Sequence, residues 1–496
     1  MPVTRPRDKS APWEPTHATA PASAPWIIWI IRIIRIIRII PIIPIIPIIR
    51  IIPTACPLAL LLTACVSAPS AGPATAPEPG QAGQARTTGA SQPAPAGLSR
   101  VRAAEQTRKI MEAVAKARAL PVTGEVAVEV MHRAEIRDYA KASMYEHNTP
   151  EQIRLFTRIE ASMGVLPVGA NGEAVLLDML ESGVMGLYEP KNKTLYIGTH
   201  VSDGQLDMVV GHEIAHGLQD MHFGLKRLQE PIRGDSDAES ARTYLVEGDA
   251  QAAYLAWVSG EGGLASISDA VFLATGNLAL DLADLVDYPV LARSLQLPYA
   301  DGAATIAALV RERGWPAVDA LYKQLPTTTE QMLHLDKLLK REPAIAVVAD
   351  PAVLGQHIPG HKVVWQDNVG EASLLAMLAD VEPAPIARAA AAGWGGDRYL
   401  VLERDPAGAA PVVVGMTAWD SEADAAEFEA TFRLYLEKAM PAAFMCERRG
   451  AQVLYASQVR DAATREALGA HAWAAFTVAG KPAGAGKPAG RGKKAS

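Results

Sequence analysis

The chain has 496 residues, which at about 150 residues per domain allows two or three domains. Hydrophobic residues make up 49% of it and charged residues 20%, so the protein is neither wholly disordered nor collagen-like. The formal net charge of −7 argues against nucleic acid as a partner, and the three cysteines exclude a disulfide framework and an all-cysteine zinc site.

Residues 1–64 are predicted to be a low-complexity region followed by a lipoprotein signal peptide. Residues 26–53 repeat pairs of isoleucines, with Trp, Arg or Pro at every third position. Because the prolines delete helical hydrogen bonds and the arginines spiral around any helix, this tract cannot cross a bilayer as one regular helix. It is either part of the native protein or sequence translated from upstream of the true start.

A secretory signal is predicted to end at Cys65. A basic residue precedes the apolar run 51–62, and the four residues 62–65 read Leu-Thr-Ala-Cys. This ending resembles the lipobox of bacterial lipoproteins, whose cysteine receives a lipid. By resemblance to the sorting rules of such proteins, Val66 rather than Asp after the cysteine indicates the outer membrane. Residues 65–100, rich in Pro, Ala, Gly and Ser, predict a flexible tether. We expect a lipid anchor in the cell envelope, facing the periplasm; the alternative is a buried cysteine in an apolar helix.

A mainly helical domain is predicted over residues 101–350. Two short runs, at 186–188 and 194–197, flank a loop that contains Pro and Asn, and they indicate a β-hairpin. Apolar periodicity predicts helices over 100–120, 124–145, 150–164, 172–182, 203–222, 237–258, 267–285, 302–313 and 316–324.

A smaller mixed α/β module is predicted over residues 360–479, after a boundary that Pro and Gly indicate near 345–360. It carries no cofactor fingerprint. The tail 480–496 has five basic and no acidic residues and is predicted to be disordered. The fold class expected is therefore α+β. Within the module the patterns predict helices over 371–379, 385–392 and 421–438, and strands over 398–403, 412–418 and 451–459.

The segment His212-Glu213-Ile214-Ala215-His216 is the strongest chemical signal in the chain. On a helix, positions i and i+4 differ by about 40°, so both imidazoles project from one face and can bind one metal ion. Glu213 lies about 100° around the helix from His212, where it can take a proton from water at the metal. Ser202 and Gln205 match a capping box that starts this helix. The alternative is two histidines at the edge of a helical core.

Two residues compete for the third ligand position of a catalytic zinc site. His222 has the spacing of the third metzincin histidine, but Gln219 stands where those enzymes have a glycine that turns the chain, so a continuing helix carries His222 out of reach. Glu247 lies among apolar and small residues, where a carboxylate is costly to bury unless it is paired or bound to metal. The neighbouring Gly248 indicates a close helix crossing. We favour Glu247, with a solvated glutamate as the alternative.

Supporting roles are expected for a few further residues. Asp249 is a candidate acceptor that orients a ligand histidine. Tyr188 or Tyr196 in the hairpin is a candidate substrate contact, with simple packing as the alternative, and the edge strand of the hairpin is a candidate partner for an extended peptide. His334 is a candidate for stabilising a developing oxyanion, with a structural role as the alternative.

Several blocks in order resemble the zincin metallopeptidases, most closely the gluzincin type, in which a glutamate is the third ligand. More narrowly, the chain resembles a poorly characterised family of bacterial and archaeal metallopeptidase-like proteins, often lipoproteins. The resemblance implies a zincin-like domain with zinc bound by His212, His216 and Glu247. It also implies that Glu213 is the base. Leu335 stands where this family more usually has proline. The blocks, spread over roughly residues 120–430, are GLYEP at 186–190, LY at 195–196, HEIAHGLQDMHF at 212–223, VEGDA at 246–250, PTTTEQMLHLDK at 326–337, GWGGDRY at 393–399 and WDSE at 419–422.

We therefore expect a zinc-dependent metallopeptidase that is anchored by lipid and cleaves a peptide or protein substrate. Zinc polarises the peptide carbonyl and lowers the pKa of its water to about 7, while Glu213 moves the proton to the leaving amine. The alternative is a non-catalytic envelope lipoprotein with a structural metal site and a partner-binding module at 360–479. Glu213 favours the enzyme, because a structural zinc site needs no base beside it.

Overall fold

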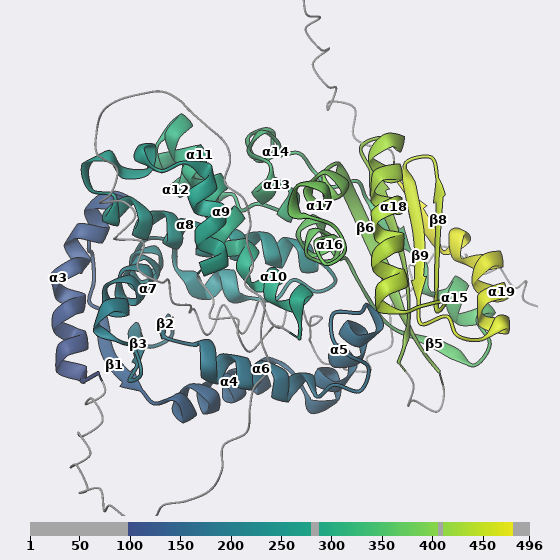
Figure 1. Ribbon diagram of the computed structural model, residues 1–496, viewed down its shortest axis with the longest axis horizontal. Coiled ribbons are helices and arrows are strands. Elements are labelled where there is room, and N and C mark those ends of the chain that lie inside the picture. The colour runs from purple at the N-terminus through teal and green to yellow at the C-terminus, as the bar shows by residue number, and fades with distance from the viewer. Residues whose placement is uncertain (1–97, 279–286, 405–409, 480–496) are drawn as a thin grey trace, which may run out of the picture.

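A computed structural model describes residues 98–278, 287–404 and 410–479 of the chain (Figure 1). The fold is α+β, which confirms the class predicted from the sequence. The predicted signal peptide with Cys65, most of the predicted tether and the basic tail lie outside the described residues. No helix in the described part of the chain is both long and apolar enough to span a membrane.

The N-terminal sheet has three strands, in the order β1-β3-β2. β2 (Gly186–Glu189) and β3 (Thr194–Gly198) form the predicted antiparallel hairpin. The helix predicted over 124–145 is wrong in its first half, because Ala127–Met131 forms β1, which pairs in parallel with β3. Only Val128 of β1 is buried, so the strand shows no clear alternation, and its main chain pairs with a strand more than sixty residues away, which local periodicity does not reveal.

Helices surround this sheet. α3 (Arg100–Arg118) begins at Ser99, whose hydroxyl accepts a hydrogen bond from the Arg102 amide, and it packs along α7 and α8. A layer of three helices runs along the lower side of Figure 1. These helices are α4 (Arg133–His147), α5 (Pro150–Ser162) and α6 (Gly172–Gly183).

Two long helices lie at the centre of this half of the molecule. α7 (Asp203–Phe223) packs against α8 (Ser236–Val258), and α8 is buried along nearly its whole length. The chain then forms a set of shorter helices around α8, of which only α9, α11 and α12 were predicted. They are η1 (Leu225–Gln229), η2 (Gly260–Ser266), α9 (Asp269–Leu278), α10 (Pro289–Leu297), η4 (Pro298–Gly302), α11 (Ala303–Arg313), α12 (Trp315–Lys323), α13 (Thr329–Leu333) and α14 (Leu335–Lys340).

The C-terminal domain is built on a five-stranded antiparallel sheet in the order β5-β6-β7-β9-β8. Side chains alternate between its two faces: Leu400 and Leu402 pack with α15 and α19, while Val401 packs with α18. The strands are β5 (His361–Asp367), β6 (Trp394–Arg404), β7 (Val412–Trp419), β8 (Phe444–Arg449) and β9 (Gln452–Ser457), and the helices are α15 (Pro351–His357), α16 (Glu371–Leu378), α17 (Ala384–Ala391), α18 (Glu422–Ala439), α19 (Ala462–His471) and η5 (Ala472–Ala475).

The segment near 345–360, where the sequence predicts a boundary, is folded. β4 (Val347–Ala349) pairs with β10 (Phe476–Val478), and α15 follows directly. The core continues between the two halves of the chain. The Phe156 ring meets the Trp365 ring edge-on at 5.4 Å between centroids, and the Tyr435 hydroxyl donates to the Met163 carbonyl at 2.7 Å. The C-terminal sheet is thus packed onto the helical half.

Candidate metal centre

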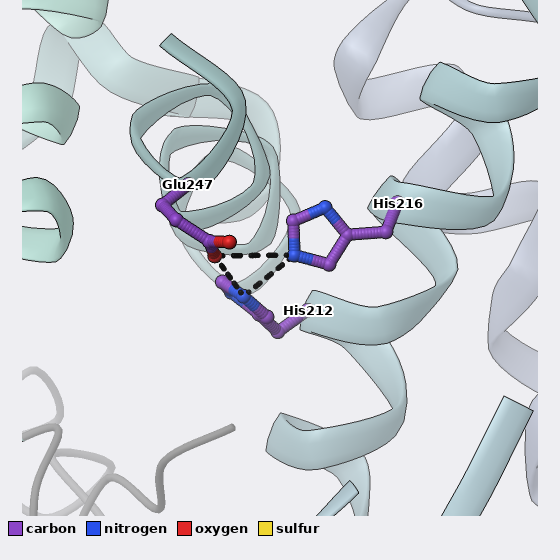
Figure 2. Close-up of side chains that lie close together, drawn as sticks. All are labelled: His212, His216 and Glu247. Carbon is purple, nitrogen blue, oxygen red and sulfur yellow. Dashed lines mark hydrogen bonds and ion pairs between the residues drawn. The ribbon is translucent and has the colours of Figure 1, made fainter. Parts of the chain in front are cut away.

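α7 carries both histidines of the metal motif. The helix starts with the predicted capping box of Ser202 and Gln205. Its middle is buried on all sides, and residues four apart project in similar directions. As a result, the rings of His212 and His216 both point toward Glu247 on α8 (Figure 2).

Three potential ligand atoms form a nearly regular triangle (Figure 2). The two Nε2 atoms of His212 and His216 are 3.1 Å apart. Oε2 of Glu247 lies 3.4 Å from the first and 3.3 Å from the second. In a tetrahedral zinc site with bonds of about 2.0 Å, ligand atoms lie about 3.3 Å from one another. The triangle therefore fits one face of a zinc coordination tetrahedron, and two imidazoles with one carboxylate suit zinc chemically.

The exposed fraction of the side chain is zero for His216 and Glu247 but 10% for His212. Solvent therefore approaches the cluster past His212. The ring of Tyr299, on the π-helical turn η4, packs beside this imidazole with 5.7 Å between ring centroids. π-Helical turns are rare and recur at functional sites. Tyr299 thus belongs to the surroundings of the metal centre, and sequence analysis missed it.

Gly248, next to Glu247, marks a close crossing of two backbones, but the partner is not α7. A Cβ at Gly248 would lie 2.4 Å from the carbonyl carbon of Gly302 at the end of η4. A Cβ at Gly302 would in turn lie 2.6 Å from the Tyr244 carbonyl oxygen. The glycine therefore lets η4 approach α8 on a different side from the histidines, and it brings Tyr299 near the site.

Gln219 fixes the orientation of His216. Its Nε2 donates to the Val246 carbonyl and to Oδ2 of Asp249, at 3.0 Å each. Both of these partners are acceptors, so the amide must present its oxygen to His216, 2.8 Å from Nδ1. An amide oxygen can only accept, so Nδ1 of His216 carries the proton. The Nε2 lone pair is then directed at the other two ligand atoms, as metal binding requires.

Asp249 does not contact the histidine directly, as the sequence predicts, but acts on it through Gln219. Its carboxylate is fully buried and accepts from Nε of Arg118 at 2.5 Å and from the Tyr322 hydroxyl at 2.8 Å. Burial alone lowers the pKa of Arg118, but the charge of Asp249 and its hydrogen bond outweigh burial and raise this pKa. The arginine therefore stays charged and fixes the Asp249 carboxylate, which in turn holds the Gln219 amide.

Glu213 is buried one position after His212, and it does not belong to the three-ligand group. A Cβ at Gly186, the first residue of β2, would lie 3.3 Å from Cγ of Glu213 and 2.5 Å from Cγ1 of Val209. The absence of a side chain at Gly186 thus leaves room for Glu213. β2 is an edge strand of its sheet, but each of its four residues is buried, so the strand is not exposed for pairing with a peptide.

The remaining candidates are engaged elsewhere. Nε2 of His222 lies 2.8 Å from the Pro121 carbonyl oxygen, and the residue is not part of the cluster. The Tyr188 hydroxyl donates to Asp220 at 3.0 Å, and the Tyr196 hydroxyl accepts from Asn192. Nε2 of His334 lies 2.7 Å from Oε1 of Glu371. None of these contacts joins the candidate to the three ligands.

A second acidic group, Glu330, Glu342 and Asp420, has its carboxylates close together. The Lys337 ammonium lies among them, paired with Glu330, 2.9 Å from Asp420 and 3.6 Å from Glu342. Burial raises the pKa of Glu330 to about 8, an effect that Lys337 reduces. Because a lysine already supplies the positive charge, we assign no metal to this group.

A family model described as a domain of unknown function (DUF8575) matches residues 361–475, which lie in the C-terminal domain and do not include the metal motif. Searches of curated proteins and of solved structures found no significant match.

Proposed function

We propose that the protein is a zinc-dependent metallopeptidase whose metal is bound by His212, His216 and Glu247. The observation that carries the proposal is the triangle of ligand atoms, with edges of 3.1, 3.3 and 3.4 Å and almost no solvent exposure. Support also comes from Gln219, which directs the Nε2 lone pair of His216 inward.

Glu213 is the proposed general base. When bound, zinc supplies a Lewis acid that lowers the pKa of water to about 7. Glu213 follows a ligand on the same helix and is 2% exposed, so its carboxylate takes the proton of an attacking water in surroundings with little competing solvent. The same group then returns the proton to the leaving amine. Tyr299 and His212 line the side from which solvent approaches.

The proposed substrate is a peptide or protein in the cell envelope. This part of the proposal rests on the lipobox-like sequence before Cys65, which predicts a lipid anchor in the outer membrane on the periplasmic side. Mass spectrometry of the mature N-terminus tests it: a diacylglyceryl cysteine at position 65 is the expected result, and an unmodified residue from upstream contradicts it.

Metal analysis and peptide cleavage together test the function. The purified chain should hold about one zinc ion, and it should cleave members of a peptide library in a reaction that a chelator stops. Glu213→Gln should lower cleavage by about 10²–10⁴-fold and leave the zinc content unchanged. Zinc without cleavage of any peptide would instead favour a structural metal site in a non-catalytic lipoprotein.

A further inference from the structure

The N-terminus of α8 is capped by the C-terminal domain. The first amides of any α-helix lack partners within the helix. In α8, the Ser236 amide donates to Oδ1 of Asp367 at 3.0 Å, and the Asp237 amide donates to Oδ1 of Asn368 at 2.9 Å. Nδ2 of Asn368 also donates at 2.8 Å to Asp235, the local cap of the same helix. Two side chains from 131 positions later in the chain thus hold the start of the helix that carries Glu247.

The same joint includes α13 and α16. The fully buried Asp237 carboxylate accepts from the Thr329 amide at 3.1 Å and from its hydroxyl. The Thr329 hydroxyl oxygen accepts in turn from the Ala372 amide at 3.1 Å. Gly370 lies against Asp237 so closely that a Cβ would be 1.9 Å from its Oδ1, and its φ of +80° also favours glycine. This contact leaves no room for sliding between α8 and the loop before α16.

The capping loop is itself fixed to the five-stranded sheet. Asp397 of β6 accepts hydrogen bonds from the Val369 amide at 2.7 Å, from the Gly370 amide at 2.9 Å and from Nε1 of Trp394 at 3.1 Å. The next residue, Arg398, donates to the Gly234 carbonyl just before α8. The position of the α8 N-terminus is therefore set by the sheet, through buried hydrogen bonds.

A second connection reaches the other side of the metal centre. Arg388 of α17 pairs with Asp301 of η4, with 3.0 Å between Nη2 and Oδ2. Asp301 lies between Tyr299, which packs on His212, and Gly302, which packs on Gly248 beside Glu247. The C-terminal domain thus contacts both elements, α8 and η4, that adjoin the ligand cluster.

We propose that the C-terminal domain, which includes the domain of unknown function at 361–475, is a fixed scaffold of the metal centre. Asp367, Asn368 and Arg388 are its positioning residues, because they hold α8 and η4 without touching a ligand. This gives the domain a role within the chain. One test of this inference, zinc affinity, depends on the proposed metal site, and none depends on peptide cleavage.

Two variants of the full chain test the inference. D367A/N368A removes the two side chains with which the C-terminal domain caps α8. Arg388→Ala removes the ion pair with Asp301 of η4, and Arg388 itself is partly exposed. The matched control is Arg404→Ala, which breaks the exposed pair with Asp461 inside the same domain. Zinc affinity is measured by competition with a chromophoric chelator, and amide hydrogen exchange is measured over residues 240–252. Circular dichroism verifies folding.

The zinc affinity of both variants should be at least about tenfold lower than that of wild type. Their α8 amides should exchange faster, while the control should match wild type in both measurements. Folded variants with wild-type zinc affinity and wild-type exchange would overturn the inference. If D367A/N368A does not fold, Arg388→Ala decides. If wild type binds no zinc, the proposed function fails. Hydrogen exchange then decides this inference alone: faster exchange of the α8 amides in the variants supports it, and unchanged exchange contradicts it.

Discussion

Replacing Gln219 with leucine is expected to weaken zinc binding by about 10–100-fold, the usual cost of losing a group that orients a ligand. Leucine is similar in volume, so the packing between α7 and α8 is largely kept. The substitution removes the oxygen 2.8 Å from Nδ1 of His216 and the amide nitrogen 3.0 Å from Val246 O and from Asp249. The imidazole is then free to carry its proton on Nε2, where it blocks the metal.

The magnitude follows from these contacts. A 10–100-fold loss of affinity corresponds to about 1.4–2.7 kcal/mol. Stability should fall independently by about 0.5–1.5 kcal/mol, the net contribution of one hydrogen bond, because the Val246 carbonyl loses its side-chain donor and keeps its partner within α8. Asp249 keeps Arg118 and Tyr322 as donors, so its own loss is smaller.

Zinc affinity is measured with a chromophoric chelator, and the tautomer of His216 is read from the ¹⁵N shifts of its ring in the metal-free protein. The matched control is Gln251→Leu, a buried glutamine on α8 whose Nε2 has no hydrogen-bond partner among the described residues. The control should bind zinc within about twofold of wild type. If Gln219→Leu also binds zinc like wild type, or keeps the Nδ1–H tautomer, the orienting role is refuted.

Further substitutions test other parts of the structure. Glu247→Ala should lose most of the bound zinc in metal analysis, whereas His222→Ala should keep it; the reverse pattern would make His222 the ligand. Burial raises the pKa of Asp367 to about 7, so the stability that depends on its protonated form is complete below about pH 4 and is lost as the pH rises through 7. Asp367→Asn keeps an acceptor for the capped amides and should flatten urea-unfolding stability between pH 4 and 8; an unchanged slope contradicts this. Gly248→Ala forces a Cβ to 2.4 Å from the η4 backbone and should cost about 1–3 kcal/mol in urea unfolding, while Gly183→Ala, which meets open space, should cost nothing.

The three proposed ligands could be predicted from the sequence because their signals are local or energetic. The spacing of His212 and His216 requires only a helix. Glu247 stands out because its neighbours are apolar and small, so a buried carboxylate there needs a cation or partner. The structure places the three candidate ligand atoms close together.

The residues that support the ligands give no comparable signal. Gln219 and Arg118 are ordinary helix residues, and their importance arises only when α3, α7 and α8 pack together. Tyr299 follows a proline inside a helical stretch, and the π-helical turn that presents it depends on the close approach at Gly248. In each case the decisive contact lies far away in the sequence.

Edge strands were missed for a similar reason. β5 and β8 each pair on one side only, and their sequences, HKVVWQD and FMCERR, lack the clear alternation of a half-buried strand. β6 and β7 lie inside the sheet and are rich in buried β-formers, and both were predicted. The blocks at 326–337 and 393–399, which the sequence distinguished only by resemblance, meet the start of α8 and the loop that caps it.

The number of ligands bears on the choice between an enzyme and a structural zinc protein. Structural zinc sites are closed by four protein ligands, whereas catalytic sites use three and keep one position for water. Within the described residues the cluster has three members, His212, His216 and Glu247. A second carboxylate, that of Glu213, is buried on α7 beside the two histidines and does not belong to this cluster. A structural zinc site needs no acid beside it, whereas a hydrolytic site needs such an acid as its base. The arrangement therefore favours catalysis.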